Sequence, residues 1–405
     1  MMNYYDAIII GGGAAGLMCA ISAKQKNTHK KIVIIEKNDR VGKKLLATGN
    51  GRCNLTNQNI TTSQYAGSFT NQAEKIFKRY STEHLLNIFG ELGLMTYADN
   101  EGRYYPVCRQ ASAVLDVLRF ACERLGVEII CQQDIKTLKK QKDKFEVKTN
   151  STEFYSDKLV IACGSKAAPK LGGNASGFDY LKNFGHKVIP FSPALCPIKV
   201  NSNVLKSLKG IRSATLATLA DENGKAIMAE LGEVQFADNA LSGICIFNLS
   251  IYAKKGYAIM LDLMPNTSFS ELCNILFKQK ELFEQQTIDN IFTGIFQKRL
   301  AQAVIKTSGI NDFSRICRDL SEKEIKSICR NVKSMKFEIS DKESFDKAQC
   351  ALGGAKGNEI DEKTMQSKIV KGLYIVGEAV DICGMCGGYN LHFAFSSGHL
   401  AGENL

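Results

Sequence analysis

A glycine-rich turn near the N-terminus constrains the fold of this chain more than any other feature. Apolar residues run directly into the sequence GGGAAG at 11–16. Residues 14–26 are rich in small side chains typical of a tightly packed helix, and a second apolar run at 32–35 ends on Glu36. A strand, a GxGxxG turn, a helix and an acid about 20 residues further on form the dinucleotide-binding fingerprint. The sequence therefore predicts a Rossmann-like βαβ unit.

Each small residue of this turn has a physical role in holding a pyrophosphate. Gly11 permits the tight turn, Gly13 lets the backbone approach the phosphates, and Gly16 lets helix and strand pack closely. Ala14 and Ala15 open the helix, where unpaired backbone N–H groups attract an anion. We therefore expect the pyrophosphate at this helix N-terminus.

The adenosine end of the ligand is expected beside the next strands. Glu36 can accept hydrogen bonds from the ribose, and Lys37 follows it. A run at 127–131 predicts a strand whose exit reaches Ile135 and could touch the adenine. Another buried run, typical of a parallel strand, ends on Gly164.

The far end of the chain indicates which dinucleotide is bound. A buried strand at 372–376 runs into Gly377 and the acids Glu378 and Asp381, and a glycine turn then opens a helix within 387–402. A flavin fits this arrangement, because its ribityl hydroxyls need acceptors and a helix N-terminus stabilises the charge of the reduced ring by about 0.3–1 kcal/mol. NAD dehydrogenases need no such element. The candidate residues at the helix start are Gly388, Tyr389, Asn390 and Leu391.

A loop between these two ends is expected to face the isoalloxazine ring. Residues 41–57 read VGKKLLATGNGRCNLTN, and the glycines within 49–54 permit close contact with a ring. Lys43 and Lys44 are placed to face phosphate or the flavin rim. Arg52 either stabilises negative charge on the flavin or substrate, or fixes the loop through an ion pair. The candidate cofactor contacts here are Gly42, Lys43, Gly51, Arg52, Cys53 and Asn54.

The 41–57 segment resembles the signature of the YhiN-like (BaiN-like, aminoacetone-oxidase-like) FAD/NAD(P)-dependent oxidoreductases. Further similar segments, in order, are 163–173, 232–243, 352–354, 365–368 and 387–402. The resemblance implies a glutathione-reductase-like FAD domain of α/β class, discontinuous in sequence, with inserted β-barrel-like and helical subdomains. Departures at 236–238, 241–244 and 381–386 leave the substrate open.

Composition along the chain predicts the domain boundaries. Pro190, Pro193 and Pro197 suggest a domain exit, after which short strand-like runs precede a helical pattern. We expect an FAD domain at 1–190 and 345–405, an inserted β subdomain at 191–265 and 332–344, and a helical subdomain at 266–331.

The composition argues against several other classes of protein. No apolar run approaches the roughly 18–20 residues of a membrane span, and the motif begins too early for a signal peptide, which favours a cytoplasmic protein. Fourteen scattered cysteines and five histidines predict neither a disulfide framework nor a metal site. The net charge is +11, and residues 298–336 hold ten basic and four acidic residues. This surplus reflects either solvated helix faces or an RNA partner.

The residues for chemistry are less well defined. Tyr389 is the leading candidate proton donor, with Arg52, Cys386 and His392 as alternatives, although Tyr389 could equally be a packing residue. Cys383 and Cys386 form a C-x₂-C pair that could be redox-active. The family pattern lacks this pair, so we expect hydride to pass from the flavin directly.

These observations favour a cytoplasmic FAD-dependent oxidoreductase. No second GxGxxG unit follows a strand, so NAD(P)H would bind only transiently on the flavin face. The expected reaction is NAD(P)H-driven reduction of a polarised C=C bond. The resemblance implies keto-steroid or bile-acid enones, or uridine in ribosomal RNA giving dihydrouridine. The alternatives are an O₂-using oxidase of a small amine such as aminoacetone, and a non-enzymatic FAD-bearing redox protein.

Overall fold

The computed structural model describes residues 3–405, and contacts divide the chain into two units. The first unit combines the N-terminal part, up to Ala194, with Phe345–Leu405, and the second is Leu195–Ser344. The first unit is therefore discontinuous in sequence. The finer division of the inserted segment into β and helical subdomains stays a prediction, because one buried apolar cluster spans its strands and helices.

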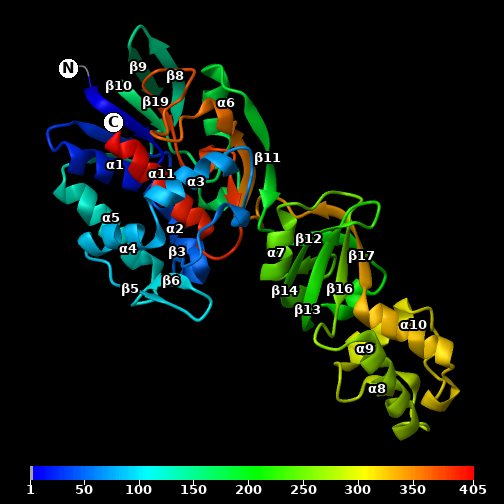
Figure 1. Cartoon of the computed structure of the whole chain (residues 1–405). Coiled ribbons are helices and arrows are strands. Elements are labelled where there is room, and N and C mark those ends of the chain that lie inside the picture. The colour runs from blue at the N-terminus through cyan, green and yellow to red at the C-terminus, as the bar shows by residue number, and fades with distance from the viewer. Residues whose placement is uncertain (1–2) are drawn as a thin grey trace. The chain divides into compact units, whose positions relative to one another are not determined.

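The first unit is built on a mixed sheet whose centre is parallel (Figure 1). Its strand order is β7-β2-β1-β10-β9-β8, and β19 pairs with the C-terminal half of β10. The pairs among β7, β2, β1, β10 and β19 are parallel, whereas β9 joins β10 and β8 antiparallel. The strands are β1 (Asn3–Ile10), β2 (Ile32–Ile35), β7 (Glu128–Ile130), β8 (Ile135–Gln141), β9 (Lys144–Thr149), β10 (Glu153–Ile161) and β19 (Leu373–Ile375).

The helices of this unit include the first and last of the chain, which lie side by side (Figure 1). A Cβ at Gly398 would lie 2.3 Å from the Ala15 carbonyl oxygen, and one at Gly402 would lie 2.4 Å from that of Cys19. Only glycine allows this close approach, so the C-terminal helix is tied to the helix that opens the GxGxxG turn. The helices are α1 (Ala14–Lys26), α2 (Lys43–Ala47), α3 (Thr70–Arg79), α4 (Thr82–Glu91), α5 (Ala111–Arg124), α6 (Ser176–Asn183) and α11 (Tyr389–Glu403).

Short strands and turns complete the first unit. The remaining strands are β3 (Thr56–Asn57), β4 (Tyr65–Ala66), β5 (Thr96–Ala98), β6 (Arg103–Pro106), β11 (Val188–Ala194), β18 (Cys350–Ala355) and β20 (Cys383–Gly384). The 3₁₀ turns are η1 (Thr48–Gly51), η2 (Thr62–Gln64), η3 (Pro169–Leu171), η7 (Gly357–Glu359) and η8 (Gly377–Ala379). Pro190, Pro193 and Pro197 were expected to mark a domain exit. Pro190 and Pro193 lie within β11, which ends at Ala194, the last residue before the second unit. A bulge between Ile189 and Ser192 accommodates Pro190 in this two-stranded sheet.

The second unit contains a closed barrel in the order β12-β15-β14-β13-β16-β17. Its strands are β12 (Ile198–Asn201), β13 (Arg212–Ala220), β14 (Ala226–Phe236), β15 (Ala240–Ser242), β16 (Ala258–Asp262) and β17 (Met335–Lys342). Its helices and 3₁₀ turns are α7 (Ile244–Ser250), α8 (Phe269–Leu282), α9 (Lys298–Thr307), α10 (Glu322–Lys333), η4 (Leu205–Leu208), η5 (Ile288–Phe292) and η6 (Cys317–Asp319). Capping boxes at Ser268 and Ser321 start α8 and α10. A strand was expected from Val332, but that residue closes the buried face of α10.

Candidate functional site

The N-terminus of α1 offers unpaired backbone donors. Gly13 precedes the helix with no side-chain cap, and the first turn carries no acidic residue. A Cβ placed on Gly13 would meet no atom within 4 Å among residues 3–405. Gly12 N–H donates to the Glu36 carboxylate at 2.8 Å, which holds the turn against the end of β2. This geometry leaves open space beside the first N–H groups of Ala14 and Ala15, where an anion can bind.

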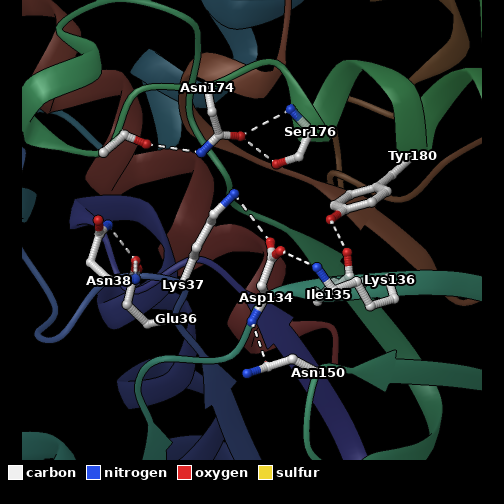
Figure 2. Close-up of polar contacts among 11 residues, drawn as sticks. Glu36, Lys37, Asn38, Asp134, Ile135, Lys136, Asn150, Asn174, Ser176 and Tyr180 are labelled. Atoms are coloured by element: carbon white, nitrogen blue, oxygen red, sulfur yellow. Dashed lines mark hydrogen bonds and ion pairs between the residues drawn. The ribbon is translucent and has the colours of Figure 1, made fainter.

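Glu36 is held in place by donors from two residues, Gly12 and Asn38, and Figure 2 shows the contact with Asn38. Its Oε1 accepts from the Asn38 backbone at 2.8 Å and from Asn38 Nδ2 at 2.6 Å, while Oε2 accepts from Gly12. The side chain is only 8% exposed. Because an ionised carboxylate offers about four acceptor positions, Glu36 retains capacity for a ribose hydroxyl.

The segment around Ile135 borders Glu36 and is ordered by polar contacts (Figure 2). Lys37 Nζ lies 3.1 Å from Asp134 Oδ1, and Lys136 Nζ lies 2.6 Å from Asp134 Oδ2. Hydrogen bonds from Lys136 and Lys37 lower the pKa of Asp134. Tyr180 OH donates to the Ile135 carbonyl oxygen at 3.5 Å. Lys37 is thus engaged with Asp134. The predicted exit from β7 is the short connection that ends at Ile135, the first residue of β8.

Two carboxylates lie where the C-terminal segment returns to the sheet. Glu378 Oε2 lies 2.5 Å from Lys44 Nζ and accepts from Ser165 Oγ at 3.4 Å, close to Gly164. Asp381 is 3% exposed, and its Oδ2 accepts from the Ser68 backbone at 2.7 Å. Its Oδ1 is buried with no hydrogen-bond partner among the described residues.

This orphaned oxygen tests whether the site fits a flavin. A buried carboxylate oxygen without a donor is costly, and a ribityl hydroxyl is a donor of the required kind. Three features together suit FAD: the open space at Gly13 for phosphate, Glu36 as an acceptor for a ribose hydroxyl, and the free oxygen of Asp381 for a ribityl hydroxyl. The Lys43 ammonium pairs with Asp39, and its contact with the cofactor stays a prediction.

The loop around η1 has an unusual backbone. Gly49, Asn50, Gly51 and Cys53 all have φ between 55° and 81°, so left-handed conformations fold the chain back on itself. Asn54 bridges the Thr56 carbonyl and the Gly388 N–H, at 3.0 and 3.1 Å, in the amide orientation that satisfies both. The loop is thereby tied to the start of α11.

The exposed residues of this loop leave room for a ligand. A Cβ on Gly51 would meet nothing within 4 Å in the described part of the chain. Arg52 is exposed, donates from Nε to the Gly49 carbonyl at 3.2 Å, and has its guanidinium 5.2 Å from the centre of the Tyr105 ring. Gly42 precedes α2 in a left-handed conformation.

The start of α11 is positioned by Tyr65 and Gly384. Tyr65 OH donates to the Tyr389 carbonyl at 2.9 Å, and the two rings meet edge to face with centroids 5.9 Å apart. Asn390 clamps Gly384 by accepting its N–H at 2.9 Å and donating to its carbonyl at 2.7 Å. Leu391 is half-buried beside them. The Asn390 side chain therefore shapes the loop, and the backbone N–H groups of the helix start are what a flavin would meet.

The alternatives to Tyr389 as proton donor differ in burial. Cys386 is half-buried. His392 is fully buried, its Nδ1 lies 2.8 Å from Thr56 Oγ1, and burial lowers its pKa to about 4. His392 is therefore neutral at pH 7 and enclosed by protein, which removes it as a proton donor.

The structure adds residues that the sequence did not single out. Asn38 and Ser68 orient the two carboxylates Glu36 and Asp381. Cys350 Sγ lies 2.9 Å from Cys383 Sγ. An amide side chain two residues after the acid was a visible signal for Asn38, whereas Ser68 and Cys350 reach the site only through long-range folding.

Comparison with known proteins agrees with this geometry. The HI0933-like protein Rossmann domain family matches residues 5–404. The chain belongs to this HI0933-like family. It is 33% identical over 402 residues to the 3-dehydro-bile acid delta(4,6)-reductase of Clostridium scindens, covering 98% of this chain and 97% of that protein. It is 27% identical over 407 residues to the ribosomal RNA dihydrouridine synthase of Haemophilus influenzae, covering 98% of each.

The fold of this HI0933-like protein also has a counterpart among solved structures. The 3-ketosteroid-delta4-(5alpha)-dehydrogenase of Rhodococcus jostii RHA1 aligns with a TM-score of 0.51 at 13% identity, covering 99% of this chain and 96% of that one. The protein is accordingly a flavoprotein oxidoreductase with a Rossmann-type FAD-binding fold. Within residues 3–405 no helix has the length and apolar character to cross a membrane. Over the same range, no group of three or more His, Cys, Asp or Glu side chains is placed to hold a metal ion.

Proposed function

We propose that this protein is a reductase that uses NAD(P)H to reduce, through FAD, the polarised C=C bond of a keto-steroid or bile-acid enone. The observation that carries the proposal is the 33% identity to a bile-acid delta(4,6)-reductase over nearly the full length of both chains. The site geometry is compatible with it, because acceptors stand at Glu36 and Asp381 and unpaired backbone donors at the start of α1, the acceptors and donors that FAD needs.

Each part of the site would hold one part of FAD. The N-terminus of α1 would bind the pyrophosphate, Glu36 the adenosine ribose, and Asp381 a ribityl hydroxyl. The N-terminus of α11 would stabilise negative charge on the reduced ring. When bound, FAD supplies a hydride carrier, and the protein supplies its position and electrostatics.

NAD(P)H would approach the flavin without a nucleotide-binding domain of its own. The sequence contains one strand–GxGxxG–helix unit, and α1 already uses it. The exposed Arg52 lies on the loop expected to face the ring and is available to contact an anionic nicotinamide dinucleotide. NAD(P)H would reduce the flavin and leave in a first half-reaction, and the reduced flavin would then reduce the substrate in a second.

Reduction of an enone also needs a proton. Tyr389 is the residue we assign to this step, because Tyr65 fixes both its ring and its backbone. Burial raises the pKa of Tyr65 well above 10, so Tyr65 stays protonated and keeps donating to the Tyr389 carbonyl. A positioned hydroxyl at the start of α11 can deliver a proton to the carbon next to the one that accepts hydride.

A second candidate function is reduction of uridine in ribosomal RNA, supported by the 27% identity to a dihydrouridine synthase. The basic segment 298–336 could contact RNA phosphates. Five of its ten basic residues, however, form ion pairs: Lys298, Arg315, Lys326, Lys333 and Lys336. These pairs reduce the charge that RNA would meet, so this candidate ranks second.

The test measures each half-reaction separately without oxygen. Flavin reduction is followed by absorbance after adding NADH or NADPH, and the reduced enzyme is then mixed with a keto-steroid enone panel, undermodified ribosomal RNA, or O₂. We expect fast flavin reduction and reoxidation by an enone. Reoxidation by RNA alone would move the function to the second candidate. Reoxidation only by O₂, or no reduction by either nicotinamide, would contradict a reductase.

A further inference from the structure

Two cysteines far apart in sequence meet in the core of the first unit. Cys350 opens β18 and Cys383 opens β20, and their sulfur atoms lie 2.9 Å apart. Both side chains are buried, at 2% and 0% exposure. A disulfide bond measures about 2.05 Å, so only a small movement separates these sulfurs from bonding distance.

The pair lies beside the residues assigned to the flavin. Cys383 follows Asp381 by two residues, and its neighbour Gly384 is clamped by Asn390. The charges of Glu378 and Lys44 reach Cys350. A covalent bond between β18 and β20 would therefore fix the segment that connects Asp381 to the start of α11.

The C-x₂-C spacing in the sequence suggested a different partner for Cys383. Cys386 is the residue that the motif would pair with Cys383, yet the contact at 2.9 Å joins Cys383 to Cys350. Both cysteines of this contact sit on strands: Cys383 is paired with Ala66 of β4, and Cys350 with Ala194 of β11. Two strand-bound thiols already in contact need little reorganisation to react with each other.

We propose that Cys350 and Cys383 form a site of reversible oxidative modification, in which a peroxide converts the two thiols to a disulfide. Hydrogen peroxide, which forms when reduced flavin is oxidised by O₂, is the oxidant. It oxidises the Cys383 thiol to a sulfenic acid, and its O–O bond breaks with release of one water. Cys350 Sγ then attacks the sulfenic sulfur, the S–O bond breaks, and the S–S bond forms with release of a second water that carries the thiol proton.

The surroundings are consistent with this order of events. Burial and the hydrogen bond with Cys383 raise the pKa of Cys350 well above 9. Cys350 is therefore a poor first target for peroxide, and it reacts second, giving its proton to the hydroxyl that leaves the sulfenic sulfur. Enclosure of the pair favours a small oxidant over a bulky disulfide such as oxidised glutathione. Transient disulfides of this kind are typical of redox-sensing proteins in reducing compartments.

The experiment uses the full-length protein, with and without FAD, and follows the thiols instead of activity. Protein is treated with hydrogen peroxide, alkylated under denaturing conditions, digested without reductant and mapped by mass spectrometry. We expect a peptide pair linked through Cys350 and Cys383, with loss of two alkylated cysteines, and full recovery of both after dithiothreitol. The same linkage without FAD would show that the thiols react without the flavin.

Matched variants identify the partners. Cys386→Ser should still form the disulfide, whereas Cys350→Ser should not and should retain a sulfenic acid on Cys383 that a dimedone probe captures. The wild-type peptide map remains decisive if Cys350→Ser fails to fold. A Cys383–Cys386 linkage, or unmodified Cys350 and Cys383 when exposed Cys108 is fully oxidised, would overturn the proposal.

Discussion

Lys44 Nζ lies 2.5 Å from Glu378 Oε2, and this ion pair joins residues 334 positions apart in the sequence. Their side chains are 31% and 17% exposed. The pair connects α2, which follows Gly42, with η8, where the C-terminal segment returns to the sheet. It therefore links the two halves of the candidate FAD site within one unit.

The first prediction concerns this link. In a double-mutant cycle with Lys44→Met and Glu378→Gln, we expect a coupling energy of about 0.5–1 kcal/mol in FAD binding, the scale of a partly exposed ion pair. Titration of apoprotein with FAD measures it. Lys43→Met is the matched control, because its ammonium pairs with Asp39 at the surface; a comparable loss there would contradict a specific role for Lys44.

The second prediction uses Gly13 and Gly16 to distinguish an effect on folding stability from an effect on FAD binding. A Cβ at Gly16 would lie 2.0 Å from the Gly11 carbonyl oxygen, whereas one at Gly13 would meet nothing within 4 Å among the described residues. Gly16→Ala should thus lower the melting temperature of the apoprotein. Gly13→Ala should leave that temperature nearly unchanged and weaken FAD binding at least tenfold, about 1.4 kcal/mol, because the methyl group enters the phosphate space. Tight FAD binding by Gly13→Ala would place the pyrophosphate elsewhere.

The third prediction tests the ribose acceptor. Glu36→Ala removes the acceptor of Gly12 N–H as well as the ribose contact, so we expect FAD affinity to fall by roughly 1–3 kcal/mol. Glu36→Gln keeps one oxygen acceptor and should lose less. Isothermal titration of apoprotein compares the variants. An unchanged dissociation constant in folded Glu36→Ala would exclude Glu36 as the ribose ligand.

The sequence predicted the nucleotide-binding part of the fold because glycine placement and apolar periodicity act within single turns, helices and strands. The helix expected at 14–26 and the strand expected at 32–35 match α1 and β2, since periodicity and glycine placement are read within one turn or strand. The Rossmann-type fold class was confirmed. The prolines at 190 and 193 lie in β11, whose bulge tolerates proline, and that strand ends at Ala194, the last residue before the second unit.

The sequence could predict a site residue only where its role depends on neighbouring residues in the chain, and not where it depends on a distant partner. Lys43 and Lys44 look alike in sequence, and only the fold shows that one pairs with Asp39 and the other with Glu378. The contact of Cys383 with Cys350 instead of a C-x₂-C neighbour depends on how β18 and β20 are placed. The assigned cofactor and catalytic residues stay predictions that the experiments here would test.

The fourth prediction is a pH dependence of stability that comes from buried histidines. Burial lowers the pKa of His392 from 6.5 to about 4, and burial also lowers the pKa of His186. Between pH 6.5 and 4.5 the unfolded chain takes up protons that folded His392 does not, so stability falls as the pH falls. The contribution of His392 over this window is about 2–3 kcal/mol.

Urea unfolding at several pH values measures this effect. His392→Asn should flatten the dependence between pH 6.5 and 4.5, while His29→Asn, an exposed control, should not. The window avoids Glu403, whose pKa is lowered to about 2 by its hydrogen bond to His399 and whose contribution is lost only as the pH falls below about 4.5. An unchanged slope in His392→Asn would show that His392 protonates readily in the folded state.

The last prediction concerns the proton donor. Tyr389→Phe removes the hydroxyl but keeps the ring that packs edge to face against Tyr65, so the helix start should remain intact. We expect flavin reduction by NAD(P)H to stay within twofold and enone reduction to slow by roughly 10²–10⁴, the usual contribution of general acid catalysis. Stopped-flow absorbance measures both half-reactions. Tyr65→Phe is the matched control, because it loses the hydrogen bond to the Tyr389 carbonyl and displaces the donor without removing it; it should slow enone reduction less than Tyr389→Phe. Equal rates of enone reduction for wild type and Tyr389→Phe would show that Tyr389 is only a packing residue. The proton donor would then be Arg52, Cys386 or solvent.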